Sequence, residues 1–172
     1  MSETAASTRD AIDAILGDAG PRVAALRRQK PELADQLQAY YRAVFEPDAD
    51  SAAALPLADR GVVAVRVASH TGSRAVADWY AAIAASAGAD AATVARARDV
   101  TDPWAEDAPL AAAIRHADML TTRPASAQRG DLDTLKEAGF TPAGIMSLSQ
   151  VVAFVSYQLR LIAGLRAIGG AA

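Results

Sequence analysis

Two histidines are the side chains of this 172-residue chain best suited to acid–base chemistry, because cysteine is absent. Without a thiol, the chain can use neither a cysteine nucleophile nor a redox disulfide. His70 is the stronger candidate for a general base, with Asp59 or Asp78 as the carboxylate that would position its ring. The candidate catalytic residues are therefore His70, Arg60 and Asp78. The simpler alternative is a histidine in the last turn of a helix, where its charge interacts favourably with the helix dipole.

The second histidine gives little support for a site. His116 lies beside Arg115 and Asp118 in a helical pattern, and we expect it on a solvated face. The two histidines are far apart and neither belongs to an HExxH motif, so no metal site is expected. The sequence has neither a GxGxxG motif nor a glycine-rich phosphate loop, and we expect no cofactor.

Two arginines near His70 have both a functional and a structural interpretation. Arg60 and Arg66 are suited to binding an anionic ligand. The default expectation is that they form ion pairs with the neighbouring Asp59 and Asp78. A ligand-binding role would need a pocket that holds an arginine beside His70.

The segment that follows His70 offers a hydroxyl and two aromatic rings. Ser73 acts as a nucleophile only if a base lies within reach, and a role as a helix N-cap explains it more simply. Trp79 and Tyr80 are suited to lining a small apolar pocket, although aromatic residues at helical spacing usually belong to a core.

Composition predicts that helices position all of these residues. Hydrophobic residues make up 52% of the chain, and the sequence contains 44 alanines. Alanine has the highest helix propensity, and the alternation of β-branched and polar residues that is typical of strands is missing. We therefore predict an all-α protein, with residues 1–172 as one domain.

Apolar spacing and breakers give the expected elements. We predict helices over 8–16, 31–45, 57–72, 73–88, 90–98, 107–122 and 131–138, and a long helix from 142 onward. Gly17, Gly20 and Pro21 are expected to end the first helix, and 46–56 is expected to be a loop. In the third helix, Val62, Val65 and Ala68 with Ser69 form the predicted apolar stripe, and Asp59, Arg60 and Arg66 lie off it.

The terminal helix carries the clearest signals. Thr141 supplies an N-cap hydroxyl and Pro142 the first helical position. Apolar residues then follow at spacings of three and four, namely Ile145, Leu148, Val152, Val155, Leu159 and Ile162. This stripe needs a partner, and another helix of the same chain is favoured over a second copy. A homo-oligomer remains an expectation, because closed homo-oligomers are common.

Charge and hydropathy limit the classes of partner that the chain is expected to have. The formal net charge is −3, and the 15 arginines and two lysines are scattered among acids, so no nucleic-acid partner is expected. Gln150, Gln158 and Arg160 make segment 148–165 too polar for a membrane span, and residues 1–9 lack the apolar region of a signal peptide. We expect a cytoplasmic protein without a membrane partner. Arginine instead of lysine, together with abundant alanine, is typical of a bacterial genome rich in G and C.

Two segments together resemble a known family. Residues 57–72 read LADRGVVAVRVASHTG and lead into the 73–82 helix, while residues 131–145 read DLDTLKEAGFTPAGI and lead into Leu148, Ser149, Gln150 and Arg160. This pattern resembles the alkylhydroperoxidase D / carboxymuconolactone decarboxylase family, over roughly residues 57–165. The resemblance implies a bundle of helices that closes with a long C-terminal helix.

The same resemblance implies a site that this chain has lost. Peroxidase members carry a Cys-x-x-Cys at the start of the site helix, a histidine four residues later and a glutamate about three turns earlier. The matching positions here are Ser73 and Val76 for the cysteines, Tyr80 for the histidine (or Trp79 in a register shifted by one) and Gly61 for the glutamate. Thiol peroxidase activity is therefore not expected.

The sequence leaves two main hypotheses of function open. The first is a helical, homo-oligomeric family member without thiol chemistry, whose role is binding or structural and for which a small-molecule ligand is a candidate partner. The second is a cysteine-independent decarboxylase or isomerase that acts on a small organic acid through His70 and Arg60. A pure helix–helix interaction module is a third. An enclosed cavity with His70 beside Arg60 or Asp78 would favour the enzyme. A filled core at Ser73, Val76 and Tyr80 would favour the first hypothesis.

Overall fold

The structure, a computed structural model, describes residues 10–17 and 20–170. These residues form helices and one 3-10 turn, and the described part of the chain contains no strand. The elements are α1 (Ala11–Leu16), α2 (Gly20–Arg27), α3 (Pro31–Phe45), α4 (Ala49–Ala54), α5 (Leu57–His70), α6 (Arg74–Ser86), α7 (Ala91–Arg98), α8 (Pro109–Thr122), η1 (Pro124–Ser126), α9 (Arg129–Glu137) and α10 (Pro142–Gly169). The predicted all-α class is confirmed.

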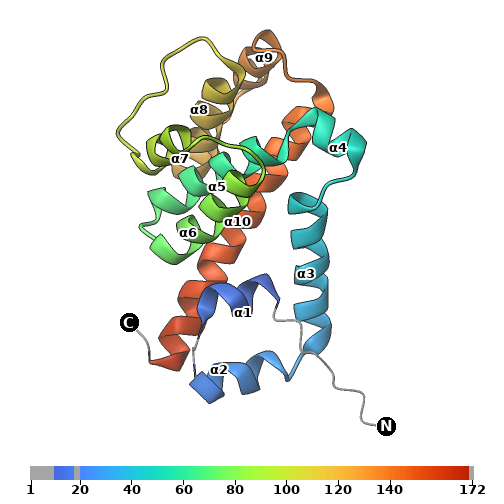
Figure 1. The fold of residues 1–172 in the computed structure, drawn as a ribbon, viewed down its shortest axis with the longest axis vertical. Helices are drawn as coiled ribbons and strands as arrows, with labels where there is room; N and C mark the ends of the chain where they lie inside the picture. Colours follow the sequence, from blue (N-terminus) through green and yellow to red (C-terminus); the bar gives the residue numbers. More distant parts are fainter. Residues whose placement is uncertain (1–9, 18–19, 171–172) are drawn as a thin grey trace.

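Helix α10 runs the length of the molecule (Figure 1). It packs against α5 and α8 near its start and against α1 and α2 near its end, with α3 alongside. Thr141 caps its first turn, because the Thr141 hydroxyl accepts a hydrogen bond from the Gly144 amide at 3.1 Å. Gly170 ends it in the left-handed conformation, with a φ of 75°. The predicted start of this helix is therefore confirmed.

By length and composition, α10 is the one helix in the described part of the chain that qualifies as a possible membrane span. Its most apolar 18 residues have a mean hydropathy of 1.5. In that window, 44% of the residues are nevertheless buried inside the protein, and the buried residues of α10 include the polar Ser147 and Gln158. Core packing thus accounts for the apolar composition of α10.

Helix α5 is the central helix of the bundle. Every residue from 60 to 68 is buried, because α6, α7, α8 and α10 pack around it. A single apolar stripe was predicted here, with Arg60 and Arg66 off the stripe. That prediction is wrong, since both arginines are 1% exposed. A helix surrounded by other helices is buried on all sides, so its polar residues must find partners inside the protein.

Two short helices were missed in the sequence. Gly20 and Pro21 were read as the end of a helix, but they begin α2, since proline is tolerated in a first turn. The predicted loop 46–56 contains α4, which Asp48 caps by accepting a hydrogen bond from the Ser51 amide at 2.8 Å. Gly17 ends α1 as predicted. Thr8 and Arg9, the predicted start of that first helix, lie outside the described residues.

Candidate functional site

Two of the positions that the sequence resemblance assigns to an active site are filled by core side chains. Val76 and Tyr80 are both fully buried on α6. The Tyr80 hydroxyl donates a hydrogen bond to Oε1 of Gln158 on α10 at 2.7 Å, and the Tyr80 ring lies 4.6 Å from the ring of Phe45. Burial raises the pKa of Tyr80 well above its usual value, so the phenol stays protonated. Neither residue is placed to carry out acid–base or thiol chemistry.

The third of these positions, Gly61, has no room for any side chain. A Cβ atom built on Gly61 would lie 2.7 Å from the Cβ of Ala84 and 2.8 Å from the Ala84 backbone. The small residues let α5 and α6 approach each other at this crossing. A glutamate of the family's type therefore does not fit here without separating the two helices.

Ser73 and Trp79 lie at the edges of this filled core. Ser73 is the N-cap residue of α6, as predicted, but its hydroxyl makes no capping hydrogen bond. Trp79 is half-buried, and its ring lies 6.5 Å from the ring of Tyr41. Trp79 thus joins an aromatic cluster with Tyr41, whereas Ser73 lies at the surface of the bundle.

The side chain of Arg60 makes hydrogen bonds to the segment that contains α4. Its guanidinium donates to three backbone carbonyls, those of Val44 at 2.7 Å, Ser51 at 2.6 Å and Leu55 at 2.8 Å. Burial lowers the pKa of Arg60 from its usual value. All three contacts lie within the protein, so the side chain holds the loops around α4 rather than pointing at a ligand. The predicted pairing of Arg60 with an aspartate is wrong.

His70 has a carboxylate partner that the sequence did not identify. The Nε2 atom of His70 lies 2.7 Å from Oδ1 of Asp118 on α8. Asp118 also accepts two hydrogen bonds at 2.7 Å from the guanidinium of Arg66. The predicted partners lie elsewhere, since Asp78 pairs with Arg98 at 2.7 Å and Asp59 is half-buried near the start of α5. No local sequence pattern links Asp118 to His70, because 48 residues of sequence separate them.

Arg66 completes this network by closing the loop that follows α7. Besides Asp118, it donates to the backbone carbonyls of Asp99, Val100 and Asp102.

His70 and Arg60 are not brought together, because ten residues of α5 separate them, about 15 Å at 1.5 Å per residue. The structure therefore assembles a His70–Asp118–Arg66 network instead of the predicted catalytic set.

His116 is buried, which corrects the prediction of a solvated face. It is 7% exposed, and it lines a small cavity of about 200 Å³ between α8 and α9 together with Asp131. Burial lowers the pKa of His116, and the carboxylate of Asp131 opposes this shift. Among the residues described, no three histidine, aspartate or glutamate side chains lie close enough to hold a metal ion.

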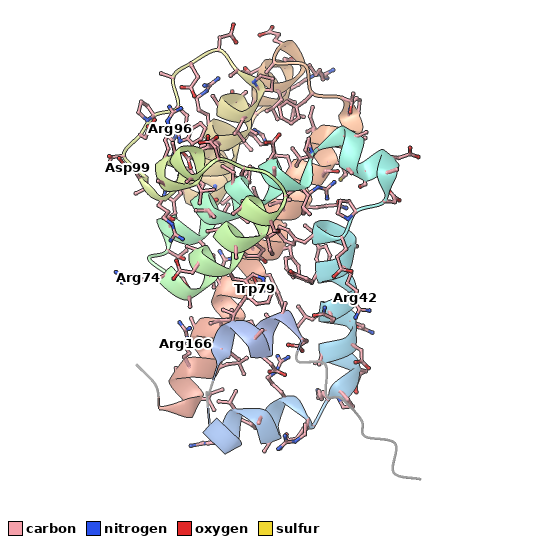
Figure 2. The ribbon with its side chains drawn as sticks, in the orientation of Figure 1. Arg42, Arg74, Trp79, Arg96, Asp99 and Arg166 are labelled. Carbon is pink, nitrogen blue, oxygen red and sulfur yellow. The ribbon has the colours of Figure 1, made fainter. Side chains whose placement is uncertain are left out.

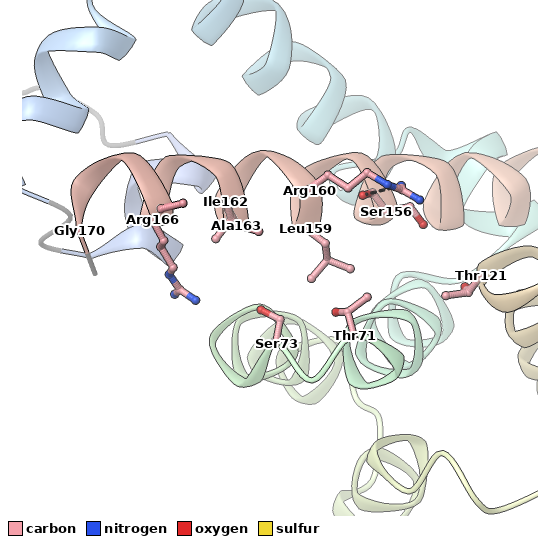
Figure 3. A pocket seen from close by; sticks show the side chains of 11 residues that line it. Thr71, Ser73, Thr121, Ser156, Leu159, Arg160, Ile162, Ala163, Arg166 and Gly170 are labelled. Carbon is pink, nitrogen blue, oxygen red and sulfur yellow. Dashed lines mark hydrogen bonds between the residues drawn. The ribbon is translucent and has the colours of Figure 1, made fainter. Parts of the chain in front are cut away.

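A groove of about 660 Å³ opens beside Ser73. It runs between the C-terminal half of α10 and the turn that joins α5 to α6 (Figure 3). Four hydroxyl-bearing residues line it, namely Thr71, Ser73, Thr121 and Ser156. Its volume lies within the range of small-molecule sites, which is about 300–1,000 Å³.

The α10 side of the groove combines apolar and cationic side chains. Leu159, Ile162 and Ala163 form its apolar surface, and Arg160 and Arg166 flank them. Figure 3 shows Leu159 pointing toward the α5–α6 turn, with Arg166 and Thr121 at opposite ends of the groove. The helical spacing of these residues was visible in the sequence. The helix that faces them was not, so the groove could not be predicted.

The network around His70 lies next to this groove. Thr71, the residue after His70, lines the groove, and so does Thr121, one turn after Asp118 on α8. His70 itself has a side chain that is 16% exposed. The groove and the network are therefore neighbours, and they share the ends of α5 and α8.

Comparison with known proteins adds no assignment to this geometry. No model of a known protein family matches the chain, and no curated protein matches it significantly.

Proposed function

We propose that this chain is a helical protein of the alkylhydroperoxidase D / carboxymuconolactone decarboxylase type that lacks thiol chemistry and binds a small organic molecule. The groove beside Ser73 is the observation that carries the proposal. At the remaining matched positions, Val76 and Tyr80 are buried and Gly61 has no space for a side chain. The usual reaction centre is thus filled, while the surface next to it stays open.

This proposal includes a homo-oligomeric, cytoplasmic protein. The exposed apolar side chains Leu33, Tyr40 and Tyr157 on α3 and α10 support a second copy as a partner, because self-association would remove them from water. The formal net charge of −3 and the absence of cysteine are compatible with a cytoplasmic location.

A thermal-shift screen tests the binding role. Small organic acids, aromatic lactones and flavins are added to the full chain, and a ligand that binds the native state raises the melting temperature. We expect a shift with at least one acid, and we expect Ala163→Phe to abolish it, because Ala163 is exposed and lines the groove. Ala143→Phe is the matched control, since Ala143 is exposed on α10 outside the groove. A screen with no shift, or a shift that survives Ala163→Phe, contradicts the proposal.

A peroxidase assay tests the chemical half of the proposal. The protein is mixed with an organic hydroperoxide and a dithiol reductant, and peroxide consumption is followed. We expect the rate of the buffer alone, because no residue of the chain can form a disulfide. Turnover above that rate would contradict a role without redox chemistry.

The His70–Asp118 pair favours a cysteine-independent enzyme as the second candidate. A carboxylate only accepts hydrogen bonds, so the 2.7 Å contact places a ring proton on Nε2 and leaves Nδ1 of neutral His70 as a base. Such an enzyme would act as a decarboxylase or isomerase on a small organic acid. Incubation of each acid that binds, followed by product analysis, separates the two candidates. Conversion that is lost in His70→Gln, with binding retained, would establish the enzyme.

A further inference from the structure

We propose that the groove beside Ser73 takes an amphipathic carboxylate, with its carboxylate on Arg166 and its apolar body on Leu159, Ile162 and Ala163. This inference rests on the proposed function, since it names the class of ligand for the same groove. Two features of the groove carry it: the sign of its charge and its apolar surface.

The charge of the groove is positive. Two arginines line it, and among the residues that the structure describes no aspartate or glutamate does. Within residues 10–17 and 20–170, Arg166 makes neither an ion pair nor a side-chain hydrogen bond, although it is partly buried. Arg160 donates only to the Ser156 carbonyl of its own helix, at 3.0 Å. A partly desolvated guanidinium without a partner favours an anion, and its planar fork matches a carboxylate.

The N-terminus of α6 strengthens this end of the groove, because Ser73, the N-cap residue of α6, lines the groove. The first turn of α6 has no acidic residue, and the Ser73 side chain leaves its amides uncapped. The positive end of the helix dipole adds to the attraction for an anion bound between Ser73 and Arg166.

The apolar surface of the groove favours a ligand with an apolar body. Leu159 and Ile162 form the floor beside the exposed Ala163, and none of these side chains can bind a polar group. A small hydrophilic anion would leave this surface uncovered. An alkyl chain or an aromatic ring would cover it, at a gain of about 25 cal/mol for each Å² removed from water.

Thr121 closes the far end of the groove. It lies at the opposite end of the groove from Arg166 (Figure 3). Its Oγ1 atom is hidden from solvent, so Thr121 offers a ligand no accessible hydroxyl. The groove therefore has a cationic end and an apolar body, which is the pattern of an amphipathic acid.

Calorimetric titration with eight-carbon probes tests this inference. Octanoate, octanol, octylamine and octyl phosphate share one chain and differ only in the head group. We expect octanoate to bind at least about tenfold more tightly than octanol, because a hydrogen bond to a charged group adds to the apolar contact. Equal affinity for octanoate and octanol, or tighter binding of octylamine or octyl phosphate, would overturn the carboxylate assignment.

Variants locate the head group. Arg166→Gln is expected to remove the preference for octanoate over octanol while octanol binding is retained. Arg42→Gln is the matched control, because Arg42 is an exposed arginine on α3, away from the groove (Figure 2). Ala163→Glu is expected to abolish octanoate binding, since it adds a negative charge to an exposed helical position. An unchanged octanoate affinity in Arg166→Gln would refute the role of Arg166.

The outcomes distinguish this inference from the proposed function. If octanol or octylamine binds best and Ala163→Phe blocks it, the groove is a ligand site but not for carboxylates. If none of the four probes binds, the inference fails, while the thermal-shift screen with organic acids, lactones and flavins still decides the proposed function on its own. If Ala163→Phe instead lowers the oligomeric state measured by analytical ultracentrifugation, a second copy covers the groove, and both the inference and the proposed function fail.

Discussion

The Nε2 atom of His70 lies 2.7 Å from the Oδ1 atom of Asp118, so the end of α5 is tied to α8 by a histidine–carboxylate contact. The same carboxylate neutralises Arg66, whose side chain is 2% exposed. Asp118 thus binds a buried arginine and the ring of a histidine at once. The two roles predict different consequences for the loss of each partner.

Asp118→Asn should lower the free energy of unfolding by about 2–3 kcal/mol, because it leaves the buried Arg66 guanidinium without a counter-charge. His70→Gln should cost less than about 1 kcal/mol, since it removes only the more exposed contact. Urea unfolding of both variants measures the difference. If the two changes cost the same, the ion pair with Arg66 is not what holds this region.

Gly61→Ala should destabilise the protein by about 1–3 kcal/mol, because the new Cβ overlaps Ala84 where α5 crosses α6. Gly164→Ala is the matched control: Gly164 also lies within a helix, but a Cβ there meets nothing within 4 Å. That control should stabilise α10 by up to about 1 kcal/mol. Melting temperatures that fall equally in both variants would argue against the close approach of α5 and α6.

Tyr80→Phe should lower the free energy of unfolding by about 1–3 kcal/mol, because it leaves the fully buried Gln158 amide oxygen without its donor. The double variant Tyr80→Phe with Gln158→Met should regain most of this loss, since both polar partners are then replaced by apolar groups. Chemical denaturation of the single and double variants completes the cycle. A double variant that is less stable than the single one would show that Gln158 has another buried role.

Stability should rise with pH through the range just below 6.5 because of His116. Burial lowers the pKa of His116 in the folded protein below its usual value of 6.5. The unfolded chain therefore binds a proton at a pH where the folded protein does not, and acidification favours unfolding. The contribution is complete above pH 6.5 and is lost as the pH falls toward the folded-state pKa.

The comparison of the chain with His116→Gln isolates this effect. The difference in melting temperature between the two proteins should change between pH 7.5 and pH 5.5, with the unsubstituted chain losing more stability on acidification. A constant difference across this range would mean that His116 does not titrate differently in the folded and unfolded states.

Much of the helical pattern was predictable because it depends on residues three or four positions apart. The bounds of α3 and the start of α10 follow from local signals, as Pro31 and the Thr141–Pro142 pair show. α2 and α4 were missed, since a short helix carries too few repeats to outweigh a Gly-Pro or Glu-Pro signal. The absence of cysteine also removed thiol chemistry without any structure.

The surroundings of each candidate side chain were decided only by tertiary structure. Arg66 and His70 meet Asp118 across 52 and 48 residues of sequence, and no local pattern encodes such a pairing. Arg60 is buried because α5 is enclosed on every side, whereas an amphipathic pattern predicts one exposed face. The groove beside Ser73 likewise depends on the spacing between α10 and the α5–α6 turn. The packing of the helices against one another sets that spacing.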